Sequence, residues 1–357
     1  MTAAAADAGA GETPMRQAVY EGPRAVAIAE RPRPRCGPRD ALVAVDACGV
    51  CGSDVASYLH GHHVRPGQVM GHESTGVVAE TGAEVAHVRA GDRVVVRPLR
   101  ACGRCAYCRR GEGHICGSTA AGSLGYGADG AFADLLLLRD EAAGRQLVAV
   151  DPATPVLDAV WAEPLAVALH ALARADTAPG DRVLVLGAGP IGLALTAAAD
   201  AAGAVVEVVE PRAARRAAAL AAGAARALAP GADAAAGEAG AVDAVLDASG
   251  VPAAIAAGCA RLTPGGALVL VGLGDGELPP LPAGVDVRGA FAFTPRDFVR
   301  SARLIERGAI ALSAAVSHTF PLHETGRAIE VAAHDEAALK VVVRPASEPE
   351  TDRGTER

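Results

Sequence analysis

Lysine and aromatic residues are the scarcest features of this 357-residue sequence. Lys340 is the only lysine, and phenylalanine, tryptophan and tyrosine together make up 3% of the residues. With so few aromatic rings, an extended platform on which bases could stack is excluded. The formal net charge of −8 argues against nucleic acid or an anionic membrane surface as a partner.

Long hydrophobic runs are also missing. No stretch approaches the ~18 consecutive apolar residues of a membrane helix, and Leu135–Leu138 is far too short. The segment Met1–Pro14 is rich in alanine and glycine but lacks the basic region and apolar run of a signal peptide. We therefore expect a soluble, cytoplasmic protein whose residues 1–16 and 345–357 form disordered tails.

What the sequence does have is 51% hydrophobic residues, enough to bury a large core in two domains. From Gln17 to about Val96, short β-rich runs alternate with glycine and proline turns, which predicts a β-rich domain without a long helix. Residues 117–130 are expected to be irregular, before a return to strand at Phe132–Leu138. The earlier strands are expected at Ala18–Tyr20, Ala41–Ala47, Gly76–Thr81 and Asp92–Val96.

The pattern changes near Ala162. A helix is predicted at Glu163–Ala175, and strands and helices then alternate at the pitch of βαβ units, which predicts an α/β fold with a doubly wound parallel sheet. The expected strands are Arg182–Leu186, Val205–Val209, Ala244–Asp247, Ala267–Val271 and Val287–Phe293, with helices at Ile191–Ala202 and Ala213–Ala222. After them we expect a helix at Pro295–Arg307, a strand at His318–Leu322, a helix at Glu324–Ala333 and a strand at Leu339–Val343.

Four cysteines stand close together with the spacing C-x2-C-x2-C-x7-C: Cys102, Cys105, Cys108 and Cys116. Four thiolates complete a tetrahedral zinc shell and leave no position open, so this spacing indicates a structural site. An iron–sulfur cluster takes the same ligands and is the main alternative, followed by redox-active thiols.

A second metal-binding pattern runs from Cys51 to the sequence Gly71-His72-Glu73. It offers a thiolate, an imidazole and a carboxylate, the ligand types of a catalytic zinc that keeps one position open. Taken alone the stretch is weak evidence, because a cysteine near a histidine is more often a packed thiol and a surface imidazole.

A glycine fingerprint follows the strand predicted at 182–186. Gly187-x-Gly189-x-x-Gly192 leads into a helix, with Pro190 and Ile191 at its start, and this arrangement is typical of dinucleotide binding. Glu210 ends the next strand, where a carboxylate accepts both ribose hydroxyls and repels a 2′-phosphate, which favours NAD over NADP. The opposing signal is a group of arginines that could hold a phosphate or lie in solvent: Arg212, Arg215 and Arg216.

Together these motifs resemble the zinc-dependent medium-chain alcohol dehydrogenases over nearly the whole chain, from Gln17 to Arg344. The resemblance implies a GroES-like catalytic domain at 17–162 and 307–344 and a Rossmann NAD-binding domain at 163–306. It rests on Cys51-Gly-Ser-Asp54, Gly71-His-Glu73, Gly91-Asp-Arg-Val94, the four-cysteine lobe, Glu163-Pro-Leu165 and the Gly187–Gly192 fingerprint.

The resemblance also implies roles for single residues. Cys51 and His72 match the ligands of the catalytic zinc, and Glu73 and Glu163 match two acids that share the remaining coordination in the sorbitol, butanediol and threonine dehydrogenase branch. Asp54 matches an acid that orients the ligand histidine. Ser53 matches the hydroxyl that takes the proton from the bound alcohol, and Cys48 is a packing residue beside the site.

The chain departs from the family pattern at Ala56, where relatives often have a histidine that passes the proton towards solvent. The neighbouring Tyr58, His60, His62 and His63 are expected to face solvent from a loop. Arg215 matches a basic position over the adenine, and Val271 and Leu273 are expected to pass the nicotinamide. Lys340 matches a basic position before the last strand, with a solvated lysine as the alternative. Core or interface positions are expected for Trp161, His170 and Cys259.

The function implied is reversible hydride transfer between a secondary alcohol and NAD, with one catalytic and one structural zinc per chain. The small-molecule substrate is expected to be polyol-like or an amino-alcohol. Alternatives are an aminocyclitol dehydrogenase, an enzyme like L-threonine 3-dehydrogenase, and a nucleotide-binding protein without turnover. As in such relatives, a homodimer or homotetramer is expected.

Overall fold

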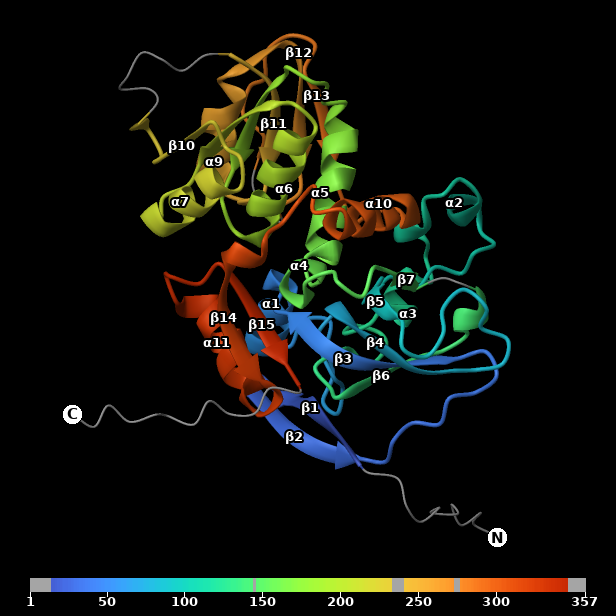
Figure 1. Cartoon of the computed structure of the whole chain (residues 1–357). Helices are drawn as coiled ribbons and strands as arrows, with labels where there is room; N and C mark the ends of the chain where they lie inside the picture. Colours follow the sequence, from blue (N-terminus) through green and yellow to red (C-terminus); the bar gives the residue numbers. More distant parts are fainter. Residues whose placement is uncertain (1–13, 144–145, 233–240, 273–276, 346–357) are drawn as a thin grey trace, which may run out of the picture.

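The computed structural model describes residues 14–143, 146–232, 241–272 and 277–345 (Figure 1). The expected tails fall mainly on 1–13 and 346–357, and Leu273 falls on 273–276, so these predictions lie outside the described residues. Strand β1 begins at Met15, two residues before the expected start of the first domain. Among the described helices, none has the length and apolar character needed to cross a membrane.

The first domain is built on a mixed sheet of seven strands in the order β14-β15-β3-β4-β5-β7, with β6 also paired to β3. Strand β3 lies at its centre and is almost entirely buried, as its alternating alanines and valines predict. The strands are β3 (Ala41–Gly49), β4 (Glu73–Thr81), β5 (Arg93–Val96), β6 (Leu135–Leu138), β7 (Leu147–Ala149), β14 (Val316–Pro321) and β15 (Lys340–Arg344). A separate antiparallel pair is formed by β1 (Met15–Gly22) and β2 (Ala25–Arg31).

Residues 17–96 contain no long helix, as predicted, but they do contain a nine-residue helix that the sequence did not predict. Helix α1 (Gly52–His60) lies there, begins after Cys51 and ends at Gly61, which has the left-handed φ of 72°. The segment expected to be irregular contains one short helix, α3 (Thr119–Gly122), and the cysteine-rich lobe contains another, α2 (Ala106–Arg109). On the C-terminal side, α11 (Thr325–His334) packs on α1, β14 and β15.

The second domain is a six-stranded parallel sheet in the order β10-β9-β8-β11-β12-β13, the strand order of a doubly wound nucleotide-binding fold. The chain starts at β8 in the middle, winds outward to β10, and then crosses to β11 on the other side of β8. Its strands are β8 (Arg182–Leu186), β9 (Val205–Val209), β10 (Arg226–Leu228), β11 (Val242–Asp247), β12 (Leu262–Leu270) and β13 (Asp286–Gly289). The α/β prediction is confirmed, and β8 and β9 have the predicted bounds.

Helices α5 (Ala162–Ala175), α6 (Pro190–Ala201) and α7 (Ala213–Ala221) pack side by side along one face of this sheet. Helix α9 (Pro252–Cys259), which follows β11, packs against β8, β11 and β12, as a right-handed crossover in the opposite direction requires. The switch of direction between β8 and β11 leaves a crevice at the carboxyl ends of the strands, the preferred ligand position in such sheets.

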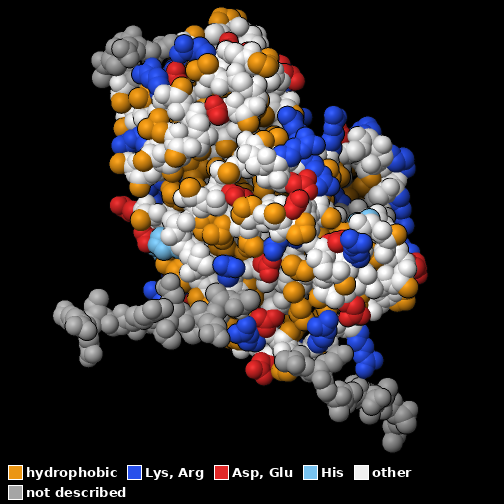
Figure 2. All heavy atoms as spheres, in the orientation of Figure 1, with side chains coloured by type: hydrophobic (Ala, Val, Ile, Leu, Met, Phe, Trp, Pro, Cys, Tyr) orange, Lys and Arg blue, Asp and Glu red, His pale blue; other side chains and the backbone are white. Residues whose placement is uncertain are grey.

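The two domains meet along α5, the short α4 (Val156–Ala159) and α10 (Pro295–Glu306), which lie between the sheets in Figure 1. One hydrophobic cluster crosses the junction, joining Ala47 and Val95 of the first domain to residues of α5 and the parallel sheet. Trp161 and Cys259 are fully buried, as expected. In the space-filling view, apolar side chains gather where the two domains meet (Figure 2).

Candidate active site

The start of α1 positions three of the predicted site residues. Cys51 is the N-cap residue, and Asp54 at the third helical position accepts a hydrogen bond from the Cys51 backbone N–H through Oδ2 at 2.9 Å. This reciprocal cap favours a helix start at Gly52 and fixes the direction of the Cys51 thiol. Ser53 lies one residue before Asp54, on the same first turn.

Asp54 also joins the helix to the segment just before β4, which carries the imidazole. Its Oδ1 accepts from the Gly71 N–H at 3.3 Å and lies 3.6 Å from Nδ1 of His72, which is itself buried. Gly71 has φ 91°, and a Cβ there would press on Cys48 and Phe132 at 2.9 Å, so this position requires glycine. An acid beside Nδ1 orients the ring and leaves the other nitrogen available for a metal.

Glu73 is the third candidate metal ligand, after Cys51 and His72. The ligand atoms of Cys51, His72 and Glu73 all lie within 4.8 Å of one another, a spacing that one metal ion can bridge. The Nδ1 atom of His72 is buried beside Asp54 and makes no hydrogen bond. The residues present therefore fit a zinc ion with a thiolate, an imidazole and a carboxylate ligand.

Lys340 belongs to this site, and the alternative of a solvated lysine is wrong. Its side chain is fully buried at the start of β15 and donates to Oε2 of Glu73, while Nζ lies 3.4 Å from the Val50 carbonyl oxygen. Burial of the ammonium opposes its charged form, but Glu73, together with Cys51 and Glu163, outweighs this and raises the pKa of Lys340.

Glu163 lies in the first turn of α5 and is not one of the three donors whose atoms come within 4.8 Å of one another. Burial raises the pKa of its carboxyl group to about 7, and the neighbouring Glu73 carboxylate adds to the rise while His72 and Lys340 oppose it. These interactions place the Glu163 carboxyl group in the neighbourhood of Glu73, His72 and Lys340. A carboxyl group titrating near neutral pH is a common feature of functional sites.

Sequence reasoning missed Tyr126. Its hydroxyl donates a 2.6 Å hydrogen bond to Oγ of Ser53, and its ring centroid lies 5.1 Å from that of His72. Burial raises the pKa of this phenol, so it stays protonated near neutral pH. The one sequence signal for Tyr126 was its setting: the chain has only four tyrosines, and this one lies in an otherwise glycine-rich segment.

The four cysteines of the predicted structural site come together in the lobe around α2. Their sulfur atoms lie within 4.8 Å of one another, with Cys105 and Cys108 at 3.5 Å and Cys102 and Cys108 at 3.9 Å. Tetrahedral zinc with Zn–S bonds of about 2.3 Å holds its sulfurs about 3.8 Å apart. Backbone N–H groups of Cys102 and Ser118 lower the pKa of Cys116 to about 6, which favours the thiolate that zinc requires. The lobe therefore fits a closed zinc site.

The glycine fingerprint forms the floor of the crevice in the second domain. Gly187 has φ 89°, Gly189 is the N-cap residue of α6, and Pro190 is its first residue, followed by Ile191. A Cβ on Gly192 would collide with the carbonyl oxygen of Gly187, so helix and turn are in contact there. These residues present a helix N-terminus to the crevice, as dinucleotide phosphates require.

A cavity of about 510 Å³ lies over this turn, and Glu210 and Arg215 line it. The buried Glu210 carboxylate accepts the backbone N–H groups of Ala188 and Arg212, both at 2.9 Å. Arg215 donates to the Ala338 carbonyl oxygen of the first domain at 3.1 Å, and burial lowers its pKa. Val271 follows β12 and donates its N–H to the Asp247 carbonyl oxygen at 2.9 Å.

The other polar residues near α1 separate into two groups. Tyr58 is not a loop residue facing solvent: it is buried in α1, and its hydroxyl donates to the Arg24 carbonyl oxygen at 3.0 Å. His60, His62 and His63 are exposed, as expected, although His60 is the last residue of α1 and not part of a loop. Cys48 is fully buried outside the donor cluster, and burial raises the pKa of its thiol well above the usual range.

Comparison with known families agrees with this geometry in both domains. Residues 37–147 match the alcohol dehydrogenase GroES-like domain, and residues 190–307 match the zinc-binding dehydrogenase domain. The chain belongs to the zinc-dependent alcohol dehydrogenase family, the medium-chain dehydrogenases and reductases. It is accordingly an oxidoreductase with a GroES-like and a Rossmann domain, and its class uses zinc and a nicotinamide cofactor, which confirms the expected family, fold and enzyme class.

Three relatives illustrate the similarity. A probable D-xylulose reductase A from Neosartorya fischeri is 32% identical over 87% of this chain and 92% of its own length. An L-threonine 3-dehydrogenase from Caldanaerobacter subterraneus subsp. tengcongensis is 31% identical over 89% of this chain and 95% of its own. The crystal structure of a zinc-binding dehydrogenase from Sinorhizobium meliloti, bound to NADP, has a TM-score of 0.85 and 28% identity, covering 94% of this chain and 100% of that one.

Proposed function

We propose that this enzyme catalyses the reversible oxidation of a secondary alcohol in a polyol or amino-alcohol, with NAD as the hydride acceptor. The observation that carries the proposal is the convergence of Cys51, His72 and Glu73 on one point. Glu163 approaches that point from α5, the helix that packs against the cofactor-binding sheet. A small-molecule site between two domains is a common arrangement in enzymes.

Each residue has a proposed task. Cys51 and His72 hold the catalytic zinc, Glu73 and Glu163 share the rest of its coordination, and Asp54 fixes the His72 ring. When bound, zinc supplies Lewis-acid polarisation of the alcohol oxygen, and the nicotinamide supplies the hydride acceptor. Ser53 accepts the alcohol proton. A second zinc in the lobe of Cys102, Cys105, Cys108 and Cys116 is proposed to be structural.

The preference for NAD is proposed from Glu210, whose carboxylate lines the cavity and is held by two backbone N–H groups. A fixed carboxylate accepts the ribose hydroxyls of NAD and repels the 2′-phosphate of NADP. Arg216 does not counter this, because its guanidinium donates to the carbonyl oxygens of Glu210 and Pro211. Arg215 is proposed to contact the adenosine half of the cofactor, and Val271 and Leu273 the nicotinamide half.

The cofactor proposal is tested by Glu210→Ala. A hydrogen-bonded charge contributes about 1.5–3 kcal/mol, so kcat/KM with NAD should fall roughly 10- to 100-fold relative to kcat/KM with NADP. An unchanged ratio of kcat/KM with NAD to kcat/KM with NADP would contradict the NAD preference. So would a wild-type protein that already prefers NADP, the cofactor bound in the Sinorhizobium meliloti structure.

The reaction is tested by measuring NADH and NADPH formation with polyols, aminocyclitols, threonine, diols and simple aliphatic alcohols, together with zinc analysis. We expect near two zinc ions per chain and turnover of polyhydroxylated or amino-alcohol substrates. Cys51→Ala should lose one zinc and the activity. Cys48→Ala, which removes the neighbouring buried thiol, should keep both.

Two results would contradict the proposal. Turnover confined to simple aliphatic alcohols would overturn the polyol substrate. One zinc per chain with no reduced cofactor formed from any alcohol would favour a nucleotide-binding protein without turnover.

We also propose a cytoplasmic homodimer formed along β13. This strand is the last in the sheet order, and beside it Val287 and Phe291 are 39% and 64% exposed. An unpaired strand edge with exposed apolar residues is a ready surface for a second copy. A reducing compartment is proposed because all eight cysteines are free and five of them are proposed zinc ligands. The mass in solution from light scattering, with Phe291→Glu as the disrupting variant, tests the dimer.

A further inference from the structure

The proton that Ser53 accepts needs a route to solvent, and α1 does not provide one. Ala56, one turn after Ser53, has no group that can carry a proton. Tyr58 lies farther along the same helix, but its hydroxyl already donates to a backbone carbonyl. The one described side chain that hydrogen-bonds to Ser53 comes from a distant segment, namely Tyr126 at 2.6 Å.

Tyr126 is held in place by an unusually well-connected turn. The Ser123 carbonyl oxygen accepts the N–H groups of Tyr126, Gly127 and Ala128, at 3.3, 3.0 and 3.0 Å. A Cβ on Gly127 would collide with the carbonyl oxygens of Ala120 and Ala121, so glycine is required there. These contacts fix the backbone from which the phenol reaches the catalytic site.

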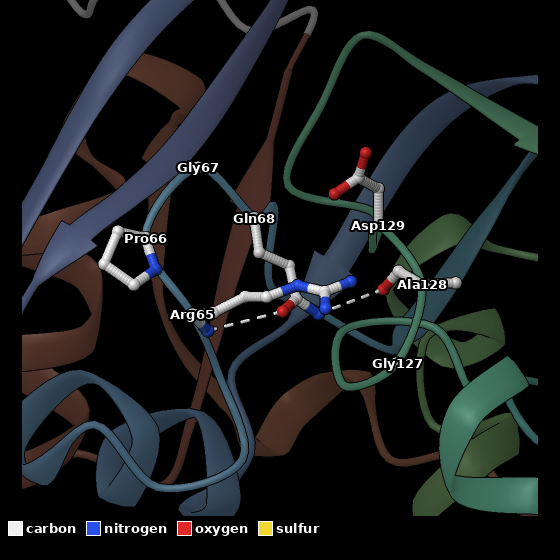
Figure 3. A pocket seen from close by; sticks show the side chains of 7 residues that line it. All are labelled: Arg65, Pro66, Gly67, Gln68, Gly127, Ala128 and Asp129. Carbon is white, nitrogen blue, oxygen red and sulfur yellow. Dashed lines mark hydrogen bonds between the residues drawn. The ribbon is translucent and has the colours of Figure 1, made fainter.

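Gln68 ties this turn to the neighbouring loop. Its buried amide donates to the carbonyl oxygens of Tyr126 and Ala128 and accepts the Arg65 N–H at 3.4 Å. Figure 3 shows the Gln68 side chain lying between the segment of Arg65 and Gly67 and the segment of Gly127 to Asp129. Gln68 therefore holds the two loops next to each other, and a cavity of about 400 Å³ lies between them.

Tyr126 also lines a second, open cavity of about 490 Å³. Exposed His63 and Arg65 line the same cavity, and the His63 ring centroid lies 6.5 Å from that of Tyr126. Tyr126 thus contacts Ser53 and also borders an open cavity that water can fill.

We propose that Tyr126 is a catalytic residue that passes the proton from Ser53 to water in this open cavity. In ketone reduction, the direction that the observed hydrogen bond matches, a cavity water gives a proton to Tyr126 Oη, the phenolic proton moves to Ser53 Oγ, and the Ser53 proton moves to the substrate oxygen. Alcohol oxidation runs the same transfers in reverse, after the Ser53 hydroxyl has turned to donate to Tyr126 Oη. The C–H bond gives its electron pair as hydride to NAD, so the reaction yields ketone, NADH and one released proton. Both hydroxyls end the cycle protonated, so neither changes its charge.

The proposal rests on the proposed function and is tested with Tyr126→Phe, which keeps the ring against His72 and removes only the hydroxyl. We expect kcat for alcohol oxidation to fall about 100-fold, at the lower end of what a positioned proton-transfer group contributes. KM, zinc content, NADH binding and the unfolding midpoint should stay close to wild type. Because proton release becomes slower, the solvent deuterium isotope effect on kcat should increase. Small buffer bases such as imidazole should restore the rate as their concentration rises.

The matched control is Tyr58→Phe, which removes one phenolic hydrogen bond on α1 away from Ser53 and should leave kcat and its isotope effect unchanged. If Tyr126→Phe raises KM while kcat holds, Tyr126 contacts substrate and the relay is wrong. If kcat falls with no change in isotope effect and no buffer rescue, Tyr126 only positions Ser53, which also overturns the relay. An inactive wild type would overturn the proposed function itself, so the two failures are distinguishable.

Discussion

The ion pair of Lys340 and Glu73 offers a test of the site that does not depend on turnover. The two side chains are 0% and 1% exposed, so Lys340→Met leaves a carboxylate buried without its counter-charge. Removing one partner of a buried pair costs about 3–5 kcal/mol. We expect a loss of this size in the free energy of unfolding of the metal-free first domain. A zinc ion bound to Glu73 supplies positive charge, so the loss should be smaller in zinc-loaded protein.

The chain provides its own probe for this measurement. Trp161 is the only tryptophan, it is fully buried, and Nζ of Lys340 lies 5.6 Å from its ring centroid. Urea unfolding followed by tryptophan fluorescence therefore reports on the junction where the pair lies. Arg89→Met is the matched control, because Arg89 is 88% exposed and its pairing with Asp92 contributes about 0.5 kcal/mol or less.

The double variant Glu73→Gln/Lys340→Met tests whether the unpaired Glu73 carboxylate causes the loss of stability. Replacing both charges removes the unpaired carboxylate, so the double variant should be more stable than Lys340→Met alone, with a coupling of roughly 1–3 kcal/mol. If Lys340→Met unfolds at the wild-type urea concentration, or if Glu73→Gln gives no recovery, the buried pair does not stabilise this domain and the argument fails.

Three further outcomes are expected. Cys105→Ser should lower the zinc content by one ion per chain while the second zinc stays, and an unchanged content would exclude a four-cysteine site. Gly189→Ala should weaken NADH binding without lowering stability, because the added Cβ meets only Arg215 at 3.7 Å. Gly192→Ala should instead lower the free energy of unfolding by about 1–3 kcal/mol, because its Cβ presses on Gly187. Equal effects of the two substitutions would refute this assignment. Burial opposes ionisation of Asp297, but hydrogen bonds from His170 and Thr294 outweigh it and lower the pKa of the carboxyl group. The ionised Asp297 therefore stabilises the fold above about pH 4, and this contribution is lost as the pH falls through the lowered pKa of the folded state. The urea midpoints of wild type and Asp297→Asn should accordingly differ at pH 6 and converge on acidification, and a constant difference would contradict this.

The cofactor domain could be predicted closely because its signals are local. The strand at 182–186 and the next at 205–209 are apolar runs bounded by glycine or charged residues, and the fingerprint from Gly187 to Gly192 marks the turn between strand and helix. Strand β10 is only three residues long and carries no comparable run, so it was not predicted.

Helix α1 was missed although the sequence contained its signal. Gly52, Ser53 and Asp54 favour turns, and they obscured the spacing of Val55, Tyr58 and Leu59, which follows the helical pattern. The capping acid at the third helical position was a further indication. Propensity suggested a loop here, while the cap and the apolar stripe, packed against α11, favour the helix.

The partners of Glu73 and Ser53 could not be predicted from spacing. Lys340 lies 267 residues from Glu73, and Tyr126 lies 73 residues from Ser53, so only the folded sheet and its loops bring them together. The single lysine of the chain, at the start of a valine-rich strand, was nevertheless a compositional sign of a buried cation. A cation in that position needs an acid, and the sequence alone offers no way to choose which one.

The two acids of the site consequently differ in a way that their sequence motifs do not reveal. Glu73 begins β4, is paired across the sheet with Gly49, and meets Lys340 from β15, so its charge is neutralised within the first domain. Glu163 belongs to α5, whose buried face packs on α6, α10 and the parallel sheet. Its raised pKa reflects burial without a salt-bridge partner among the described residues. A carboxyl group in this setting can hold or release a proton near neutral pH, and its position relative to the three donors follows the packing of α5. Glu73 therefore carries a charge that is paired within the first domain, whereas the Glu163 carboxyl group is held on a helix at the junction of the two domains without such a partner among the described residues.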